Sequence, residues 1–267
     1  MENVILLDMD GTITPPRKPI EPEMIDALFE LSKVSKIGIV TGSGLDYVLQ
    51  QCSDLLKPAY NMKNFFLLPC NGTQKYEWSE SDWENGYWTK TFNMDMREFV
   101  GEDKFNKTMS FLTEQLYITH LTNPPIPKTG HFISYRGSLI NWCPIGRQAI
   151  ERDRKAFIEY DKENKLRRKK IAKFKESFMC DFLSFSMGGN TSIDIYPVGW
   201  DKTQALNHFI NLDPWFIGDR CTVPTGNDKP LYDKIRADKP DQAFEVKSTT
   251  DTLKIVKKIT KKLNNQE

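Results

Sequence analysis

The sequence lacks the features that mark several large classes of protein. Its five cysteines are odd in number, are widely scattered and include no Cys-x-x-Cys pair, which disfavours a disulfide framework and a zinc site. The 37 basic and 36 acidic side chains leave none of the basic excess that a general nucleic-acid binder carries. No apolar run approaches the roughly 20 residues that span a bilayer, and no secretory leader is visible. We therefore expect a cytoplasmic protein that binds neither nucleic acid nor membrane.

Apolar and aromatic residues, at 39% and 12% of the chain, are plentiful enough for one large core or two modest ones. Segments with helical spacing alternate, toward both ends of the chain, with short apolar runs at 4–8, 36–42, 65–70 and 215–219. Continuous apolar strands that alternate with helices indicate a parallel sheet covered on both faces. We expect residues 1–91 and 198–267 to form this Rossmann-like α/β core.

The middle of the chain has a different pattern. Pairs of short strand-like segments flank the glycine turns at 137–138 and 188–190, as in antiparallel hairpins. Between them lies a long, charged helical stretch, 151–178, whose apolar face would carry Leu166, Ile171, Phe174 and Phe178. Its basic run, 166–175, is better explained as a solvated helix than as an RNA site. We expect residues 92–197 to form an inserted α+β cap domain, with an antiparallel sheet and helices.

Two aspartates, Asp8 and Asp10, directly follow the first apolar run. Ligands of open parallel sheets bind at the carboxyl ends of the strands. All four runs here end in polar or glycine-rich turns, at Asp8/Asp10, Gly42/Ser43, Asn71/Gly72 and Asp219. Neighbouring carboxylates repel each other and are costly to bury, and a bound Mg²⁺ with oxygen ligands removes both problems. The alternative, an aspartate that only caps a turn, is disfavoured by the second strand that ends in an aspartate.

Short motifs along the chain resemble those of known enzymes. DMDGT resembles the DxDxT signature of the haloacid-dehalogenase (HAD) phosphotransferase superfamily, and Ser43, Lys202 and GDRCTVPTGND match its later motifs. The segments DMDGTITPPR, FISYRG, CPIGR, SFSMGGNTSIDIYP and GWDK occur in order over nearly the whole chain. As a set they resemble the eukaryotic-type phosphomannomutases, which implies a HAD-type core with an inserted cap.

The resemblance implies phosphoryl transfer through a carboxylate. Asp8 would be the nucleophile that forms an aspartyl-phosphate. Asp10 would be the general acid/base, which protonates the leaving sugar oxygen and later deprotonates the incoming one. Lys202 would offset negative charge on the nucleophile and the phosphate, and Ser43 would bind phosphoryl oxygens.

The resemblance also implies a magnesium site. The ion would sit between Asp8, the backbone carbonyl of Asp10, and Asp219, while Asp228 would support the metal loop from outside the ligand set. The loop 219–228 is one residue longer than is usual in such mutases. The sequence therefore leaves the geometry of this loop open, together with any second cation site.

A mutase needs a second phosphate site, because a hexose bisphosphate places one phosphate in the core and leaves the other outside. Arginine suits this distal group, since its planar fork matches phosphate oxygens. Arginines that such mutases use on substrate are matched by Arg17, Arg136, Arg147 and Arg154. Positions that contact sugar hydroxyls are matched by Ser192 and Asp194. For any one arginine, a solvated surface position is the alternative.

The resemblance thus implies a phosphomannomutase that interconverts mannose 6-phosphate and mannose 1-phosphate with Mg²⁺ and a hexose 1,6-bisphosphate activator. It further implies a part in GDP-mannose supply, some activity on glucose phosphates, and a homodimer formed through the cap. A HAD-type sugar-phosphate phosphatase, or a mutase biased toward glucose, is the alternative. A non-catalytic phosphosugar-binding protein is a more distant one.

Two stretches depart from the mutase pattern. Gly44 stands where such mutases usually have an acidic residue after the serine. The stretch 78–88 is longer than usual and rich in aromatic residues, namely Trp78, Trp83, Tyr87 and Trp88. We expect these rings to cover a hairpin that extends the core, with binding of a sugar or a partner as the alternative.

Overall fold

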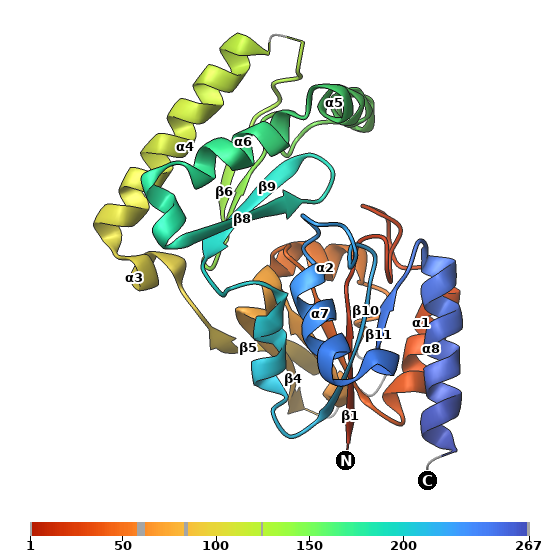
Figure 1. Cartoon of the computed structure of the whole chain (residues 1–267). Helices are drawn as coiled ribbons and strands as arrows, with labels where there is room; N and C mark the ends of the chain where they lie inside the picture. The colour runs from red at the N-terminus through yellow and green to blue at the C-terminus, as the bar shows by residue number, and fades with distance from the viewer. Residues whose placement is uncertain (1, 58–61, 83–84, 124, 266–267) are drawn as a thin grey trace. The chain divides into compact units, whose positions relative to one another are not determined.

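Two compact units make up the chain in the computed structural model (Figure 1). The terminal unit comprises residues 1–93 and 200–267, and the inserted unit comprises residues 94–199. The structure describes residues 2–57, 62–82, 85–123 and 125–265. Each unit has its own sheet and its own apolar interior, so each is described by itself.

The terminal unit is built on a seven-stranded sheet in the order β11-β10-β1-β2-β3-β4-β5. Its parallel strands are β1 (Asn3–Leu7), β2 (Lys36–Val40), β3 (Phe65–Leu68), β10 (Asp213–Gly218) and β11 (Ala243–Glu245). An antiparallel hairpin of β4 (Gln74–Asp82) and β5 (Asn85–Asn93) extends one edge. Because β1 pairs with both β2 and β10, segments from before and after the inserted unit lie side by side.

Alternate side chains of β1 enter different apolar layers on the two faces of this sheet. Ile5 and Leu7 pack in the layer formed with α1 (Pro22–Ser32), α2 (Leu45–Gln51) and α8 (Thr249–Asn264). Val4 and Leu6 pack in the layer formed with the 3₁₀ helix η4 (Lys202–His208) and α7 (Lys229–Asp238). Burial on both faces is why these strands are apolar without alternation. The short 3₁₀ helices of this unit are η1 (Met62–Asn64), η2 (Cys70–Gly72) and η5 (Pro240–Gln242).

The inserted unit packs a four-stranded antiparallel sheet, in the order β6-β7-β9-β8, against helices. Its strands are β6 (Ile133–Tyr135), β7 (Ile140–Trp142), β8 (Leu183–Gly188) and β9 (Ser192–Pro197). Its helices are α3 (Met96–Val100), α4 (Glu102–Thr122), α5 (Glu151–Asn164), α6 (Leu166–Lys175) and the 3₁₀ helix η3 (Phe178–Asp181).

The two faces of the inserted sheet differ in polarity. On the apolar face, Trp142 donates its ring N–H to the carbonyl of Leu112 on α4, at 3.1 Å. The ring of Phe174 on α6 lies 5.6 Å from that of Trp142 and 5.7 Å from that of Phe185. On the opposite face, a cross-strand row of polar residues runs through Ser134, Asn141, Asp194 and Ser186. Side chains alternate between faces along each strand, so covering one face with helices leaves this row on the other.

The expected fold class is confirmed. The terminal unit is a core of mainly parallel strands with helices on both faces, and the inserted unit is an antiparallel sheet with helices. The expected hairpin is confirmed as well, although one of its aromatic rings, that of Tyr87, is 55% exposed. Trp78 and Trp88 are cross-strand partners with ring centroids 5.4 Å apart, and both pack against the core layer of α1. Trp83 lies outside the described residues.

The charged stretch 151–178 differs from its expectation, because it forms two α helices and a 3₁₀ turn. Lys165, with φ +55°, separates α5 from α6. Across this break the carboxylate of Asp161 accepts hydrogen bonds from the backbone N and from Nε of Arg167, each at 2.8 Å. Both partners are buried, so Arg167 is not the solvated residue that the basic run suggested.

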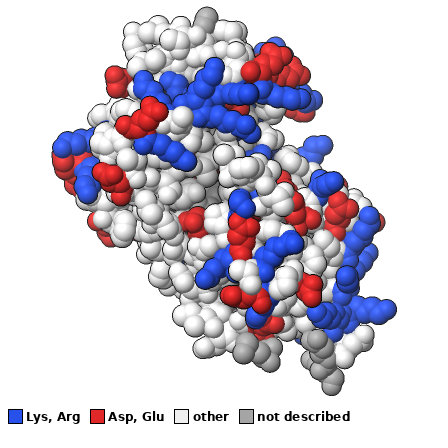
Figure 2. All heavy atoms as spheres, in the orientation of Figure 1, with Lys and Arg blue, Asp and Glu red and all other residues white. Residues whose placement is uncertain are grey.

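Lys170 is buried as well and donates from Nζ to Oε1 of Gln115 at 3.4 Å, whereas the other four basic side chains of α6 face solvent. Lys and Arg gather over the inserted unit where α5 and α6 lie, as Figure 2 shows. Leu166, Ile171 and Phe174 are buried as expected, whereas Phe178 lies beyond the helix and is 46% exposed. None of the helices in the described part of the chain combines the length and apolar character needed to cross a bilayer.

We expect Phe174→Ala to lower the free energy of unfolding by about 3–5 kcal/mol, because it leaves a cavity beside Trp142 and Phe185. Urea denaturation followed by circular dichroism measures this loss. Lys173→Ala is the matched control, since Lys173 is exposed on the same helix and its loss should change stability by less than about 0.5 kcal/mol. An equal loss in the free energy of unfolding in the two variants would contradict the packing of Phe174 against Trp142 and Phe185.

Candidate active site

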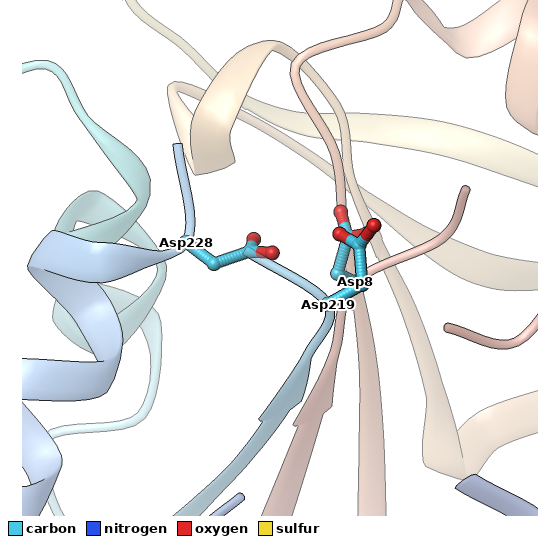
Figure 3. Close-up of side chains that lie close together, drawn as sticks. All are labelled: Asp8, Asp219 and Asp228. Atoms are coloured by element: carbon cyan, nitrogen blue, oxygen red, sulfur yellow. The ribbon is translucent and has the colours of Figure 1, made fainter. Parts of the chain in front are cut away.

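A buried lysine joins two aspartates at the carboxyl edge of the parallel sheet. Lys202 donates from Nζ to Oδ1 of Asp8 and, at 2.6 Å, to Oδ1 of Asp228. The side chains of Lys202 and Asp228 are 0% exposed, and that of Asp8 is 7% exposed. Asp219 completes a cluster in which one carboxylate oxygen from each of Asp8, Asp219 and Asp228 lies within 4.8 Å of the others (Figure 3).

The sheet brings these residues together. Asp8 and Asp219 each follow a strand end, and the strands β1 and β10 are parallel neighbours whose last pairs include Leu7 with Ile217. The backbone N of Asp8 continues this pairing by donating to the carbonyl of Ile217 at 2.9 Å. Gly218 leaves room for the third carboxylate, because a Cβ there would lie 2.8 Å from Cγ of Asp228. The expected approach of Asp8 and Asp219, two of the four strand ends, is therefore present.

The charges in this cluster do not balance without a cation. Burial and the charge of Asp228 raise the pKa of Asp8 well above its usual value, and Lys202 offsets this only in part. Burial and Asp228 also raise the pKa of Asp219 to about 6. Burial by itself lowers the pKa of Lys202, but Asp228 and Asp8 outweigh it and raise that pKa overall. The lysine therefore stays protonated. Arg220, whose Nε lies 4.0 Å from Oδ2 of Asp219, adds a second positive charge, but these two positive charges still leave the three carboxylates with an excess negative charge.

The donor set suits a hard divalent cation. Asp8, Asp219 and Asp228 offer carboxylate oxygens, and the cluster contains no His or Cys ligand. Asp228, expected to lie outside the ligand set, offers a carboxylate oxygen within 4.8 Å of one from each of the other two. Its second oxygen, Oδ2, accepts a hydrogen bond from the backbone N of Arg220 at 3.0 Å, which fixes the carboxylate in the loop. These residues could hold a metal ion.

Asp10 lies in the same loop as Asp8, but its carboxylate is held by other partners. Oδ1 of Asp10 accepts a hydrogen bond from the hydroxyl of Tyr47 at 2.9 Å and one from the backbone N of Arg17 at 3.0 Å. Arg17 itself is exposed and has φ +61°. Sequence reasoning missed Tyr47, and the helical spacing of α2 gave no sign of its partner.

The turns that end β2 and β3 fix the position of Ser43. Its carbonyl accepts a hydrogen bond from the backbone N of Cys70 at 2.9 Å, and Thr41 accepts one from Asn71 at 2.8 Å. Asn71 also donates from Nδ2 to the carbonyl of Trp200 at 3.3 Å, just before Lys202. Hydrogen bonds therefore connect the turn that carries the half-buried Ser43 to the turn just before the buried Lys202.

A second polar cluster lies within the inserted unit and contains three of the expected residues. Asn141 donates from Nδ2 to Oδ1 of Asp194 at 2.6 Å and to Oγ of Ser192 at 2.9 Å. Its Oδ1 accepts a hydrogen bond from Nη1 of Arg147 at 3.2 Å. Sequence reasoning missed Asn141, although its place between apolar neighbours on a short strand is a signal that it points to the polar face.

The other two expected arginines of this unit are half-buried. Arg136 follows β6, and its backbone N donates to the carbonyl of Leu139 at 2.9 Å in the turn to β7. Arg154 lies in the first turn of α5, where its backbone N donates to the carbonyl of Ile150 at 3.0 Å. These bonds fix the backbone positions from which the two side chains extend.

Comparison with known proteins identifies the family of this chain. The sequence model of one family, described as eukaryotic phosphomannomutase, matches residues 24–262. A phosphomannomutase of Glycine max is 33% identical over 257 residues, which cover 96% of this chain and 95% of that protein. A phosphomannomutase of Drosophila melanogaster is 35% identical over 241 residues, 88% of each chain. The chain belongs to the eukaryotic phosphomannomutase family.

The fold of this family member is shared with more distant proteins. The structure of an IMP-bound, N-terminally truncated IMP-nucleotidase of Plasmodium falciparum superimposes with a TM-score of 0.62 at 15% sequence identity. The match covers 97% of this chain and 68% of that one. At this identity the likeness concerns the fold alone, and it agrees with the HAD-type fold expected from the DxDxT motif.

We expect the metal-free protein to become more stable as the pH falls from about 7 to about 5. The pKa of Asp219 is raised from 3.8 to about 6, so in this range the folded chain binds a proton that the unfolded chain does not. Proton binding then favours the folded form. The resulting increase in the free energy of unfolding, about 1–3 kcal/mol, is complete near pH 4 and is lost as the pH rises through about 6. Urea denaturation in the presence of a chelator at several pH values measures it.

Asp219→Asn should reduce this gain, while Asp233→Asn, which removes an exposed carboxylate paired with Lys229, should leave it unchanged. A gain of the same size in Asp219→Asn and in the unaltered protein would refute the assignment.

Proposed function

We propose that this protein interconverts mannose 6-phosphate and mannose 1-phosphate through a phosphorylated Asp8 and a hexose 1,6-bisphosphate intermediate. Membership of the eukaryotic phosphomannomutase family, with about a third of the residues identical over most of the chain, carries this proposal. The carboxylate cluster and the separate arginine-bearing cluster support it, because a mutase must bind both a reacting phosphate and a distal one.

In one half of the reaction, a carboxylate oxygen of Asp8 forms a bond to one phosphorus of the hexose 1,6-bisphosphate, and the bond from that phosphorus to the sugar oxygen breaks, which leaves phospho-Asp8 and a hexose monophosphate. Asp10 gives its proton to that sugar oxygen. In the other half, Asp10 takes the proton from the free hydroxyl of a hexose monophosphate, whose oxygen attacks the phosphorus of phospho-Asp8. The bond from that phosphorus to the Asp8 oxygen breaks, which forms the bisphosphate and frees the carboxylate. Lys202 supports both halves, because its contact with Asp8 fixes the carboxylate and offsets negative charge.

Magnesium fits the acidic cluster of Asp8, Asp219 and Asp228, together with the backbone carbonyl of Asp10. When bound, the ion would neutralise the carboxylates and the phosphoryl oxygens, which otherwise repel the nucleophile. Ser43 binds phosphoryl oxygens from the turn after β2. The raised pKa of Asp8 and of Asp219 supports this assignment, because a divalent cation stabilises the ionised forms.

The inserted unit binds the sugar and the distal phosphate in this proposal. Ser192 and Asp194 contact sugar hydroxyls, and Asn141 orients both of them. Arg147 binds the distal phosphate, and Asn141 holds its guanidinium in place. The arginines that share this task are Arg17, Arg136 and Arg154.

The finer assignments follow from the same proposal. Hexose 1,6-bisphosphate activates the enzyme by phosphorylating Asp8. The product serves GDP-mannose synthesis in the cytoplasm, which accords with the five free cysteines. A homodimer forms through residues 92–197. Water must be kept from phospho-Asp8 during turnover, since hydrolysis would convert the mutase into a phosphatase.

Asp8→Asn should lower the rate of isomerisation at least roughly a thousandfold, because an amide cannot form the phosphoenzyme. The measurement follows both isomerisation and phosphate release from mannose 1-phosphate and from glucose 1-phosphate, with Mg²⁺ and the bisphosphate present. Asp233→Asn, an exposed carboxylate on α7, is the matched control and should keep full activity. If the unaltered protein mainly releases phosphate, the phosphatase alternative replaces the mutase.

Arg147→Lys should raise the KM for mannose 1-phosphate about tenfold to a hundredfold, because lysine cannot make the two-pronged contact of a guanidinium with phosphate. Steady-state isomerisation kinetics measure this change. Arg168→Lys, at an exposed position of α6, is the control and should behave as the unaltered protein does. An unchanged KM in Arg147→Lys would exclude this arginine from the distal site.

A further inference from the structure

We infer that Tyr47 is a positioning residue that orients the carboxylate of Asp10 for proton transfer. This inference rests on the proposed function, in which Asp10 is the general acid/base. It adds a side chain from a different element, the helix α2, to the reaction. The hydrogen bond from the Tyr47 hydroxyl to Oδ1 of Asp10, at 2.9 Å, is the observation from which it starts.

Two donors fix the same oxygen of Asp10. The Tyr47 hydroxyl reaches Oδ1 from α2, and the backbone N of Arg17 reaches it at 3.0 Å from the loop after β1. Arg17 adopts φ +61°, a left-handed conformation that is costly for a residue with a Cβ. The loop thus maintains an unfavourable backbone geometry at the residue that supplies one of the two donors.

The second oxygen of Asp10 remains available for chemistry. Within the part of the chain that the structure describes, Oδ2 of Asp10 accepts no hydrogen bond. A carboxylate with one oxygen held by two donors cannot turn freely about its Cβ–Cγ bond, so Oδ2 keeps one direction. Proton transfer to a sugar oxygen needs such a fixed approach, since small misplacements of a reacting group lower the rate strongly.

Tyr47 also connects this carboxylate to the turn that carries Ser43. The backbone N of Tyr47 donates to the carbonyl of Gly44 at 3.2 Å, in the first turn of α2. Its ring packs against the apolar layer of α1 and α8. A phenylalanine ring would pack in the same way, so packing does not explain why a hydroxyl contacts Asp10. The hydroxyl therefore has a role separate from packing, and Tyr47→Phe removes the hydroxyl while keeping the ring.

Tyr47→Phe in the 267-residue chain tests the role of this hydroxyl, and the rate of isomerisation of mannose 1-phosphate is measured. We expect kcat to fall about tenfold, the effect of losing one hydrogen bond to a charged group, while KM stays within about twofold. Tyr76→Phe, which removes a hydroxyl from a buried tyrosine on β4, is the matched control and should keep both constants. Thermal unfolding of both variants shows whether the loss is one of stability.

The same substitution in an Asp10→Ala background separates positioning from a general structural effect. If Tyr47 acts through Asp10, its replacement causes no further loss once the carboxylate is gone. A tenfold loss in both backgrounds, an unchanged kcat in Tyr47→Phe, or a rise in KM alone would each overturn the inference. Failure of the unaltered protein to isomerise the sugar phosphate would instead reject the proposed function.

Discussion

A buried ammonium group connects the parts of the candidate active site. Lys202 is inaccessible to solvent and contacts both Asp8 and Asp228, so these two carboxylates stabilise its charge. A buried charge without its partner is strongly unfavourable, which ties the lysine and the aspartates to one geometry. This ammonium group and the guanidinium of Arg220 cannot balance three carboxylates, however. Burial together with the excess negative charge explains the raised carboxyl pKa values, and the excess charge also explains the affinity for a divalent cation that we propose.

This pair also depends on the topology of the chain. Asp8 and Lys202 are 194 residues apart in sequence, and the whole inserted unit lies between them. They meet because β1 pairs with β10 and because the turn before η4 is bound by Asn71 from the end of β3. The site therefore exists only when both terminal segments have joined the same sheet. The inserted unit can carry its own sheet and polar cluster without interrupting this pairing.

The parts of this arrangement that could be predicted are those encoded in local sequence. Asp8 and Asp219 stand directly after buried apolar runs, and parallel strands place their carboxyl ends on one edge, so their approach follows from the pattern. Tyr47 and Asn141 could not be found in this way. Their partners are 37 and 53 residues distant, and which atoms meet depends on the placement of a helix and on the register of two strands. The break at Lys165 was missed for the same reason, because the Asp161–Arg167 contact that spans it is not a helical spacing.

Contacts at both ends fix the loop between Asp219 and Asp228. Thr222 donates from its backbone N to Oε1 of Glu245 at 2.8 Å, which anchors the exposed part of the loop to β11. At the other side Gly226 passes so close to Arg220 that a Cβ would lie 2.0 Å from the Arg220 carbonyl oxygen. The loop is therefore closed at its base and open only around 222–225. The closed base holds Asp228 within reach of Asp8 and Asp219.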